Sequence, residues 1–517
     1  MEMQKLYEEV ENKNIVKNDL VDLTIGESLK IKAYPLSVLK KDDAFFFIGK
    51  ENYDKFLFVI SAGKENGLLN EFEGELIDAG KDVTVKKCNL STKNRKAVQK
   101  IFPHTVPVVL GLCNSFGCGD RLGVANAGHI RAIKQSSFRP ILAQQSIREL
   151  TRTNRTPDDV MDAAVWAVLQ EGYKDGFGSD ADHLKTFEDI DLMLNAGFTM
   201  FTFDPSEHVD NEADNYSEDQ LKQKLNEIDW SGLQDTSADA AKRYVDMTFN
   251  ISERLSLTIK ESDFLRAYAK YGNAIAHIKK MYDYLASKAD KDTFEIEVSV
   301  DETESVTSPF EHFFFANELN RLGVKYVSLA PRFIGDFEKG IDYKGDLNLF
   351  KTEYEKHLDI TKYFGSYKIS LHSGSDKFSA YRVIGSLKGA YTHVKTAGTS
   401  YLEALRVVAA KEPALFRDIL DFCRDLYETE KRSYHVSADI NKVKPANQYS
   451  DTELIELFNQ NDARQVLHVT FGKVLTEKDS SGQFLFKDKI MKCLVENEET
   501  HYEFLEKHFL KHLECFK

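Results

Sequence analysis

The sequence predicts an α/β protein built around a (β/α)8 barrel of the TIM type, with an N-terminal α/β extension and helical insertions. Two observations favour this fold class. Short apolar runs rich in β-branched residues recur from Val106 onward, and segments with helical periodicity separate several of them. Strands that alternate with helices pair in parallel through right-handed crossovers, and eight such strands can close into a barrel. An open doubly wound sheet is the alternative.

Eight apolar runs are the candidate barrel strands: residues 106–112, 140–143, 199–203, 294–300, 324–329, 367–371, 390–394 and 466–471. Helical periodicity is found in segments between them: residues 157–170, 183–195, 261–286, 311–322 and 400–427. The barrel is therefore expected to occupy residues 106–475.

Three segments lie outside the minimal barrel. Residues 1–105 read as a small α/β extension, with strands expected at 44–48 and 56–60. Residues 205–257 are long, acidic and polar, which predicts a helical insertion after the third strand. Residues 476–517 contain a helical stretch and are expected to form a capping segment.

Composition limits the class of partner. The formal net charge is −15, which opposes binding to nucleic acid. The N-terminus is polar, and no apolar run approaches the ~18 residues of a membrane span, so no membrane association is expected. The six cysteines include no CxxC pair, which suggests a reducing compartment. We therefore expect a cytoplasmic protein, and assembly of identical subunits is compatible with the sequence.

The ends of the candidate strands carry the polar groups. In a barrel of this kind, reactive residues lie at the C-terminal ends of the strands and in the loops that follow. One apolar run ends in Leu371-His-Ser-Gly-Ser-Asp-Lys-Phe378. His372 there is either a metal ligand or a histidine satisfied in a tight turn, and the former fits its neighbours better. The candidate substrate-binding residues at these ends are Ser146, Thr202, Arg332, Ser373, Asp376, Lys377, Lys395 and His468.

Two segments with acidic residues have two interpretations each. Glu295 and Glu297 alternate with apolar residues and share one face of a strand. A carboxyl group in an apolar layer would have a raised pKa and could act as an acid, whereas a salt bridge with Lys395 or Arg332 is the alternative. Asp182-His183 is either a helix N-terminus or a base beside a metal ligand.

A glycine-rich segment raises the question of a dinucleotide. Gly117, Gly119 and Gly123 follow a candidate strand, but their spacing departs from GxGxxG. The next strand ends in Gln144-Gln145, where a dinucleotide site would have an acidic residue. A nicotinamide-dependent uronate oxidoreductase is therefore a weaker alternative, and no nucleotide cofactor is expected.

Several motifs together resemble the tagaturonate/fructuronate epimerases. They are Phe116-Gly-Cys-Gly-Asp-Arg-Leu-Gly123, Gly128-His-Ile-Arg131, Ser179-Asp-Ala-Asp-His-Leu-Lys185, Ala330-Pro-Arg-Phe333, Phe337-Glu-Lys-Gly340 and the segment around His372. The resemblance spans most of the chain from Val106 to His468. It implies a metal-dependent epimerase that interconverts D-tagaturonate and D-fructuronate, two small sugar acids, by inversion at C4 in ketose numbering.

The resemblance also implies residue roles. Asp182 would be the proton acceptor and Glu297 the proton donor. His183 and His372 would bind one divalent metal ion, with Glu338 as the third ligand. Nitrogen and oxygen ligands of this kind suit zinc, manganese, cobalt or nickel. An aldose–ketose isomerase or an aldolase acting on sugar acids is the alternative, because the same metal and acid/base pair would serve either reaction.

Overall fold

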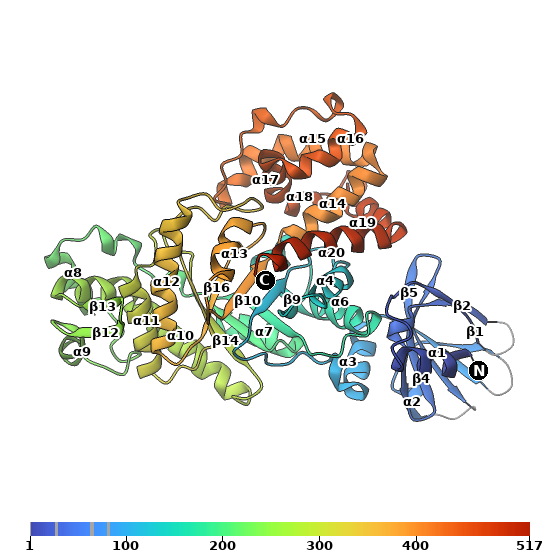
Figure 1. Ribbon diagram of the computed structural model, residues 1–517, viewed down its shortest axis with the longest axis horizontal. Coiled ribbons are helices and arrows are strands. Elements are labelled where there is room, and N and C mark those ends of the chain that lie inside the picture. The colour runs from blue at the N-terminus through green and yellow to red at the C-terminus, as the bar shows by residue number, and fades with distance from the viewer. Residues whose placement is uncertain (1, 26–28, 63–66, 80–82, 517) are drawn as a thin grey trace.

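The computed structural model describes residues 2–25, 29–62, 67–79 and 83–516. Figure 1 shows a central barrel with a small N-terminal sheet on one side and an insertion on the opposite side. Helices from the C-terminal part of the chain lie above the barrel in the same view.

Within the described residues, eight parallel strands close a barrel, so the predicted fold class is confirmed. Around the barrel the order is β10-β11-β14-β15-β16-β17-β8-β9. The strands are β8 (Ser115–Cys118), β9 (Arg139–Ser146), β10 (Gly178–Leu184), β11 (Met200–Phe203), β14 (Glu295–Val300), β15 (Ser328–Pro331), β16 (Lys368–Leu371) and β17 (Thr392–Thr396).

The predicted count of eight strands is right, but two of the predicted strands are wrong. Residues 106–112 form no strand. The backbone N–H groups of Leu110 and Gly111 donate to the carboxylate of Glu295, the first residue of β14. Residues 466–471 lie in α17 (Asn461–Val469) and α18 (Phe471–Thr476), whose apolar side chains are buried against other helices. A short apolar run does not by itself separate a buried strand from a buried helix.

The sequence did not reveal two of the barrel strands, β8 and β10, because neither overlaps a predicted run. β10 lies where no strand was predicted. Its inward positions are polar, so residues 178–184 contain no apolar run. The predicted helix at 183–195 accordingly starts later, as α7 (Phe187–Ala196), with the Thr186 side chain as its N-cap. The predicted acidic insertion therefore follows the fourth barrel strand along the chain, β11, instead of the third.

Helices surround the barrel. They are α4 (Asn126–Ile133), α5 (Ile147–Thr153), α6 (Pro157–Gln170), α7, α10 (Glu261–Lys288), α11 (Pro309–Arg321), α12 (Leu347–Tyr363), α13 (Phe378–Gly385) and α14 (Thr399–Lys411). The helix predicted at 400–427 is two helices, because α15 (Pro413–Glu430) starts at a proline that cannot continue α14. One apolar core joins the barrel strands to most of these helices.

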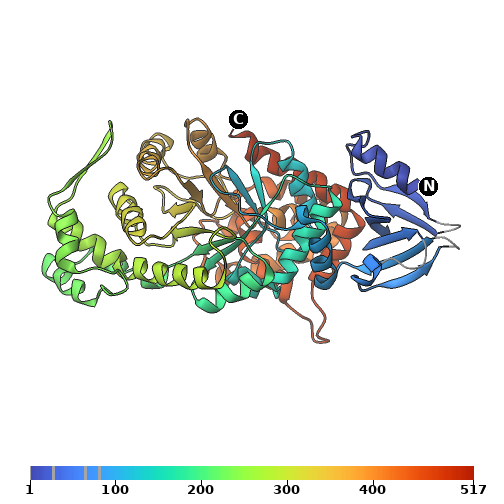
Figure 2. The same cartoon turned by 90° about the horizontal axis from the view of Figure 1, so that it is seen from below.

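The insertion contains helices α8 (Glu218–Lys224) and α9 (Ser237–Tyr244), and it also contains a hairpin that was not predicted. The hairpin strands are β12 (Thr248–Ser252) and β13 (Leu255–Thr258). Figure 2 shows this hairpin projecting away from the barrel, on the side opposite the N-terminal sheet.

The N-terminal sheet is antiparallel, in the order β1-β2-β4-β5-β7-β6, with β3 beside β4. The strands are β1 (Val21–Ile25), β2 (Leu29–Ala33), β3 (Leu39–Lys41), β4 (Ala44–Glu51), β5 (Asp54–Ala62), β6 (Glu75–Asp78) and β7 (Val83–Asn89). Both strands predicted here, at 44–48 and 56–60, are confirmed as β4 and β5. One face packs on α6 and α3 (Thr92–Ile101), and the other packs on α1 (Glu2–Glu11).

The C-terminal segment ends in α19 (Lys487–Glu496) and α20 (Glu498–Glu514). Leu505, Phe509 and Leu513 of α20 belong to the barrel core, so this helix is packed into the domain. Among the described helices, none has the length and apolar character that crossing a bilayer requires.

Candidate active site at the C-terminal end of the barrel

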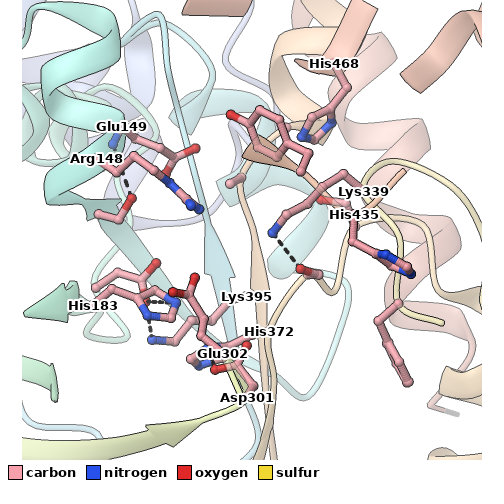
Figure 3. Close-up of a pocket in the computed structure, with 18 of the residues that line it drawn as sticks. Arg148, Glu149, His183, Asp301, Glu302, Lys339, His372, Lys395, His435 and His468 are labelled. Carbon is pink, nitrogen blue, oxygen red and sulfur yellow. Dashed lines mark hydrogen bonds and ion pairs between the residues drawn. The ribbon is translucent and has the colours of Figure 1, made fainter. Parts of the chain in front are cut away.

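A cavity of about 260 Å³ lies at the C-terminal ends of the barrel strands. Figure 3 shows charged side chains that face it from several strands and loops. Of the predicted site residues, those that line it are Ser146, Asp182, His183, Arg332, His372, Ser373, Lys395 and His468. The structure therefore brings together residues from Ser146 to His468, which are 322 positions apart in the sequence.

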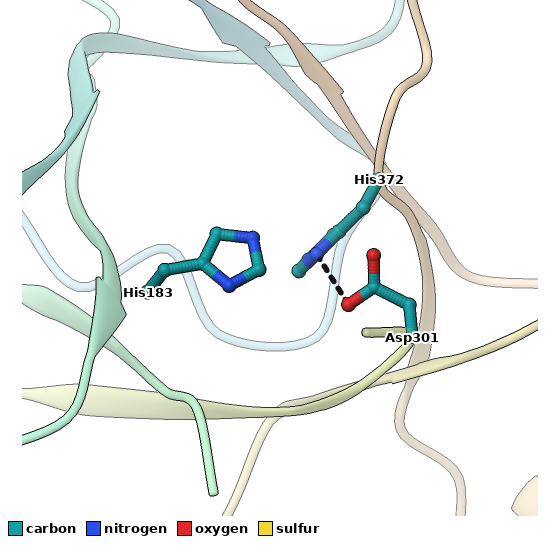
Figure 4. A group of neighbouring side chains, drawn as sticks. All are labelled: His183, Asp301 and His372. Atoms are coloured by element: carbon teal, nitrogen blue, oxygen red, sulfur yellow. Dashed lines mark ion pairs between the residues drawn. The ribbon is translucent and has the colours of Figure 1, made fainter. Parts of the chain in front are cut away.

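Two histidines and an aspartate form a group of ligand-type side chains whose members all line this cavity. Ligand atoms of His183, Asp301 and His372 all lie within 4.8 Å of one another. Figure 4 shows the two imidazole rings and the Asp301 carboxylate meeting at the barrel mouth. The Nδ1 atom of His372 lies 3.0 Å from Asp301 Oδ1, and the ring centroids of His183 and His372 are 4.9 Å apart.

The local backbone of β10 explains how His183 reaches the cavity. Alternation along the strand points Asp180 and Asp182 toward the barrel interior and would point His183 away from it. The pairing of β10 with β11 shifts register between Ala181 and Leu184, and His183 has a left-handed φ of 54°. Such bulges and left-handed residues re-aim side chains at functional sites. Asp182 and His183 can therefore both line the cavity.

Lys395 joins the carboxylates of the barrel interior. Its Nζ atom lies 2.7 Å from Asp180 Oδ2, 2.7 Å from Asp182 Oδ1 and 2.8 Å from Glu297 Oε1. It also donates a hydrogen bond to Thr202 Oγ1 at 2.6 Å. Three carboxylates therefore surround one ammonium group, which leaves an excess of negative charge beside the two histidines.

The electrostatics of the site keep the carboxylates of Asp182 and Glu297 ionised. Burial alone would raise the pKa of Asp182 and of Glu297, but Lys395 and the nearby histidines hold both pKa values well below their usual range. The prediction that an apolar layer raises the pKa of Glu297 is therefore wrong. The alternative interpretation, a salt bridge with Lys395, is the one that the structure shows.

The same negative charge acts on the histidines. Burial alone would lower the pKa of His183, but Asp182 and Asp204 raise it to about 9. Burial would likewise lower the pKa of His372, but Asp301 and Glu297 raise it to about 10. Each imidazole therefore lies where a positive charge is stabilised. A divalent cation would meet the same need, and two imidazoles with one carboxylate form a donor set that suits a transition metal.

Not every predicted residue lies in the cavity. Glu338, predicted as the third ligand, lies outside the group of His183 and His372. Its carboxylate accepts hydrogen bonds from Ser437 and from Gln465. Asp301, which directly follows β14, lies beside His372 instead. Both acidic residues follow barrel strands, so the sequence did not distinguish them.

Two residues behind the cavity were predicted to bind substrate. Asp376 is buried, and its carboxylate pairs with Arg464 of α17 and with His508 of α20. The Nζ of Lys377 donates to the backbone carbonyls of Glu338, Ile341 and Ser375. The buried side chains of Thr202 and Glu297 also do not line the cavity, but they contact Lys395, and Glu297 accepts from His372 Nε2 at 2.6 Å.

Asp376 holds the loop that carries His372. Its backbone N–H donates to His512 Nε2 at 3.0 Å, and its carboxylate accepts from Thr399 Oγ1 as well as from Arg464 and His508. Asp376→Ala is expected to lower the free energy of unfolding by about 3–5 kcal/mol, because it leaves the buried Arg464 charge unpaired. Chemical denaturation measures the loss. Asp346→Ala, which removes the exposed N-cap of α12, is the control and should cost about 1 kcal/mol. Equal losses in the two variants would contradict this role of Asp376.

Comparison with known proteins places the chain in a family. Residues 34–516 match the family described as UxaE, tagaturonate epimerase. The chain belongs to the tagaturonate epimerase family. A tagaturonate/fructuronate epimerase from Thermotoga maritima is 43% identical over 486 residues, which cover 94% of this chain and 97% of that protein.

Solved structures of the family have the same fold. A glycerol complex of the fructuronate-tagaturonate epimerase UxaE from Cohnella laeviribosi is 39% identical and superimposes with a TM-score of 0.88, covering 94% of this chain and 96% of that one. A second complex, with two glycerols, is 37% identical with the same TM-score of 0.88 and covers 100% of this chain and 99% of that one.

The motifs that suggested the tagaturonate epimerase family meet at this site. Asp182 and His183 come from one motif, Arg332 from another, and His372 from a third. The glycine-rich motif has a structural role, because a Cβ atom at Gly119 would lie 2.5 Å from the carbonyl oxygen of Thr396 on the neighbouring strand. The sequence did not indicate two further residues of the site. Asp180 pairs with Lys395 inside the barrel, and Arg148 lies on the short helix α5, beyond the strand end where site residues were expected.

Proposed function

We propose that this chain interconverts D-tagaturonate and D-fructuronate by inverting the configuration at C4, with one divalent metal ion held by His183, Asp301 and His372. The observation that carries this proposal is the pair of histidines among ionised carboxylates at the barrel mouth, in a chain of the tagaturonate epimerase family. The relatives named above are epimerases of these two sugar acids.

The chemistry at C4 sets a constraint. C4 is β to the ketone at C2, so the ketone does not acidify the C4–H bond. Removal of the proton from the C4 hydroxyl instead allows the C3–C4 bond to break, which gives an aldehyde at C4 and an enediolate at C2 and C3. Rotation of the aldehyde followed by re-formation of the C3–C4 bond inverts C4. A divalent ion held by His183, Asp301 and His372 would supply Lewis acidity for this chemistry.

Asp182 is the residue best placed to move the hydroxyl proton. It lines the cavity, and its low pKa keeps it ionised as a base. It can return the same proton to the C4 oxygen after the bond re-forms. Glu297 lies behind His372 and Lys395, with no exposed surface, so we assign it the task of orienting these two side chains. This assignment replaces its predicted role as proton donor.

Product analysis tests the proposed function. Protein loaded with zinc, manganese, cobalt or nickel is incubated with D-fructuronate, and the products are resolved by chromatography. The expected product is D-tagaturonate. Accumulation of an aldose acid would indicate an isomerase, and accumulation of two three-carbon fragments would indicate an aldolase. Either result without D-tagaturonate would contradict the proposal.

Solvent deuterium separates the two routes of inversion. Bond cleavage between C3 and C4 keeps the C4 hydrogen attached, so turnover in D₂O is expected to leave no deuterium at C4, as read by NMR of the product. Deuterium at C4 in every turnover would instead support proton exchange between two bases at that carbon.

We further propose that the chain acts in the cytoplasm on small sugar acids. The absence of a CxxC pair and the six free cysteines of the described chain support a reducing compartment. Assembly of identical subunits stays a prediction, and its test is the mass of the particle in solution.

A further inference from the structure

Among the described residues, five lysine and arginine side chains line the cavity, and three of them pair with a carboxylate or with a backbone carbonyl. Arg121 pairs with Glu149, and Lys395 pairs with the three carboxylates described above. Arg332 donates to the backbone carbonyl of Thr303. The other two are Arg148 and Lys339, for which the described part of the chain provides no carboxylate at ion-pair distance.

Arg148 and Lys339 face the same space. In Figure 3 both side chains point toward the centre of the cavity, on the side away from His183, Asp301 and His372. The Nζ of Lys339 donates to Ser373 Oγ at 2.5 Å, and Ser373 directly follows His372. Burial lowers the pKa of Lys339, and the nearby positive charge of Arg148 lowers it further. Glu149, Asp301 and Glu302 act on the pKa of Lys339 in the opposite direction, but in the described chain none of them forms an ion pair with Lys339 or Arg148. Two like charges that share one space stabilise an anion between them.

His468 adds a neutral polar group to this part of the cavity. It is 2% exposed, and neither of its ring nitrogens has a hydrogen-bond partner among the described residues. Burial, with the positive charges of Arg121 and Lys339, holds its pKa well below the usual value, so the ring is neutral. The ring occupies space that only glycine leaves free, because a Cβ atom at Gly398 would lie 1.9 Å from it.

We propose that Arg148, Lys339 and His468 form the subsite that binds the carboxylate end of the substrate. The ketone end then lies near His183, Asp301 and His372, and the subsite makes the enzyme prefer sugar acids to neutral ketohexoses. This inference rests on the proposed function for the identity of the substrate. Lys377 and Lys395, which were predicted to bind substrate, are not assigned to the carboxylate, because protein oxygen atoms already surround their ammonium groups.

Kinetics of neutral variants test the subsite. Lys339→Met and Arg148→Met are each expected to raise the KM for D-fructuronate about 10- to 100-fold, which corresponds to the loss of one hydrogen bond to a charged group. The value of kcat and the metal content should stay close to wild type. Lys339→Arg, which keeps the charge, should recover most of the affinity. Lys431→Met removes a half-buried lysine that pairs with Glu428 and does not line the cavity, and it is the matched control.

Calorimetry provides a second readout that does not depend on turnover. Metal-loaded wild type is expected to bind D-gluconate at least about 10-fold more tightly than the neutral polyol D-glucitol, and Lys339→Met should remove most of this preference. If wild type shows the preference but does not convert D-fructuronate, the proposed function fails and the subsite stands. An unchanged KM in both methionine variants, or a preference for D-gluconate that survives in them, would overturn the subsite.

Discussion

His372→Ala is expected to lose the metal ion and to reduce turnover by more than about 100-fold, while the chain stays folded. Loss of a group that only orients a ligand costs about 10–100-fold in affinity or activity, and loss of the ligand itself should cost more. The His372 side chain lines the cavity, so we expect its removal to leave the barrel core intact. Elemental analysis gives the metal content, and thermal unfolding gives the stability.

His208→Ala is the control for this change, because His208 is exposed in the insertion and does not line the cavity. The control should keep both metal and turnover. A His372→Ala protein that retains one metal ion per chain and normal turnover would show that His372 is only a turn residue.

Asp182→Asn and Glu297→Gln are expected to lose activity for different reasons. Asp182→Asn should lower kcat by about 10²–10⁴-fold with metal still bound, because it removes the base at the cavity. Glu297→Gln should mainly weaken metal binding, by about 10–100-fold, because His372 loses the carboxylate that orients it. Measurement of kcat as a function of metal concentration separates the two effects.

At saturating metal, Glu297→Gln should regain most of its turnover, and Asp182→Asn should regain none. Wild-type turnover in Asp182→Asn would remove this carboxylate from the reaction. A Glu297→Gln protein that binds metal normally but turns over slowly would show that Glu297 moves a proton itself, as the resemblance implied.

The sequence predicted the barrel because most of its strands are apolar on the sides that meet the helices. Residues 294–300 and 367–371 are examples, and both lie on barrel strands. It failed at β8 and at β10. In β10 the site requires Asp180 and Asp182 to face the interior. The polar residues that make the strand functional also remove the apolar pattern that identifies a strand.

Predicted residues that end a strand line the cavity, whereas a predicted residue that distant segments hold does not. Asp182, His183 and His372 meet because parallel strands end at the same rim of the barrel. Asp376 follows His372 by four positions, yet its carboxylate is held by Arg464 and His508, which lie far along the chain. No local pattern shows that such a side chain turns away from the cavity.

Stepwise return of a divalent ion to metal-free protein tests the central claim most directly. Protein freed of metal by a chelator, and shown by elemental analysis to contain none, is titrated with zinc, manganese, cobalt or nickel while conversion of D-fructuronate to D-tagaturonate is measured. We predict no turnover without metal and a rise that ends at one ion per chain for at least one of these metals. Full turnover by the metal-free protein would contradict the account.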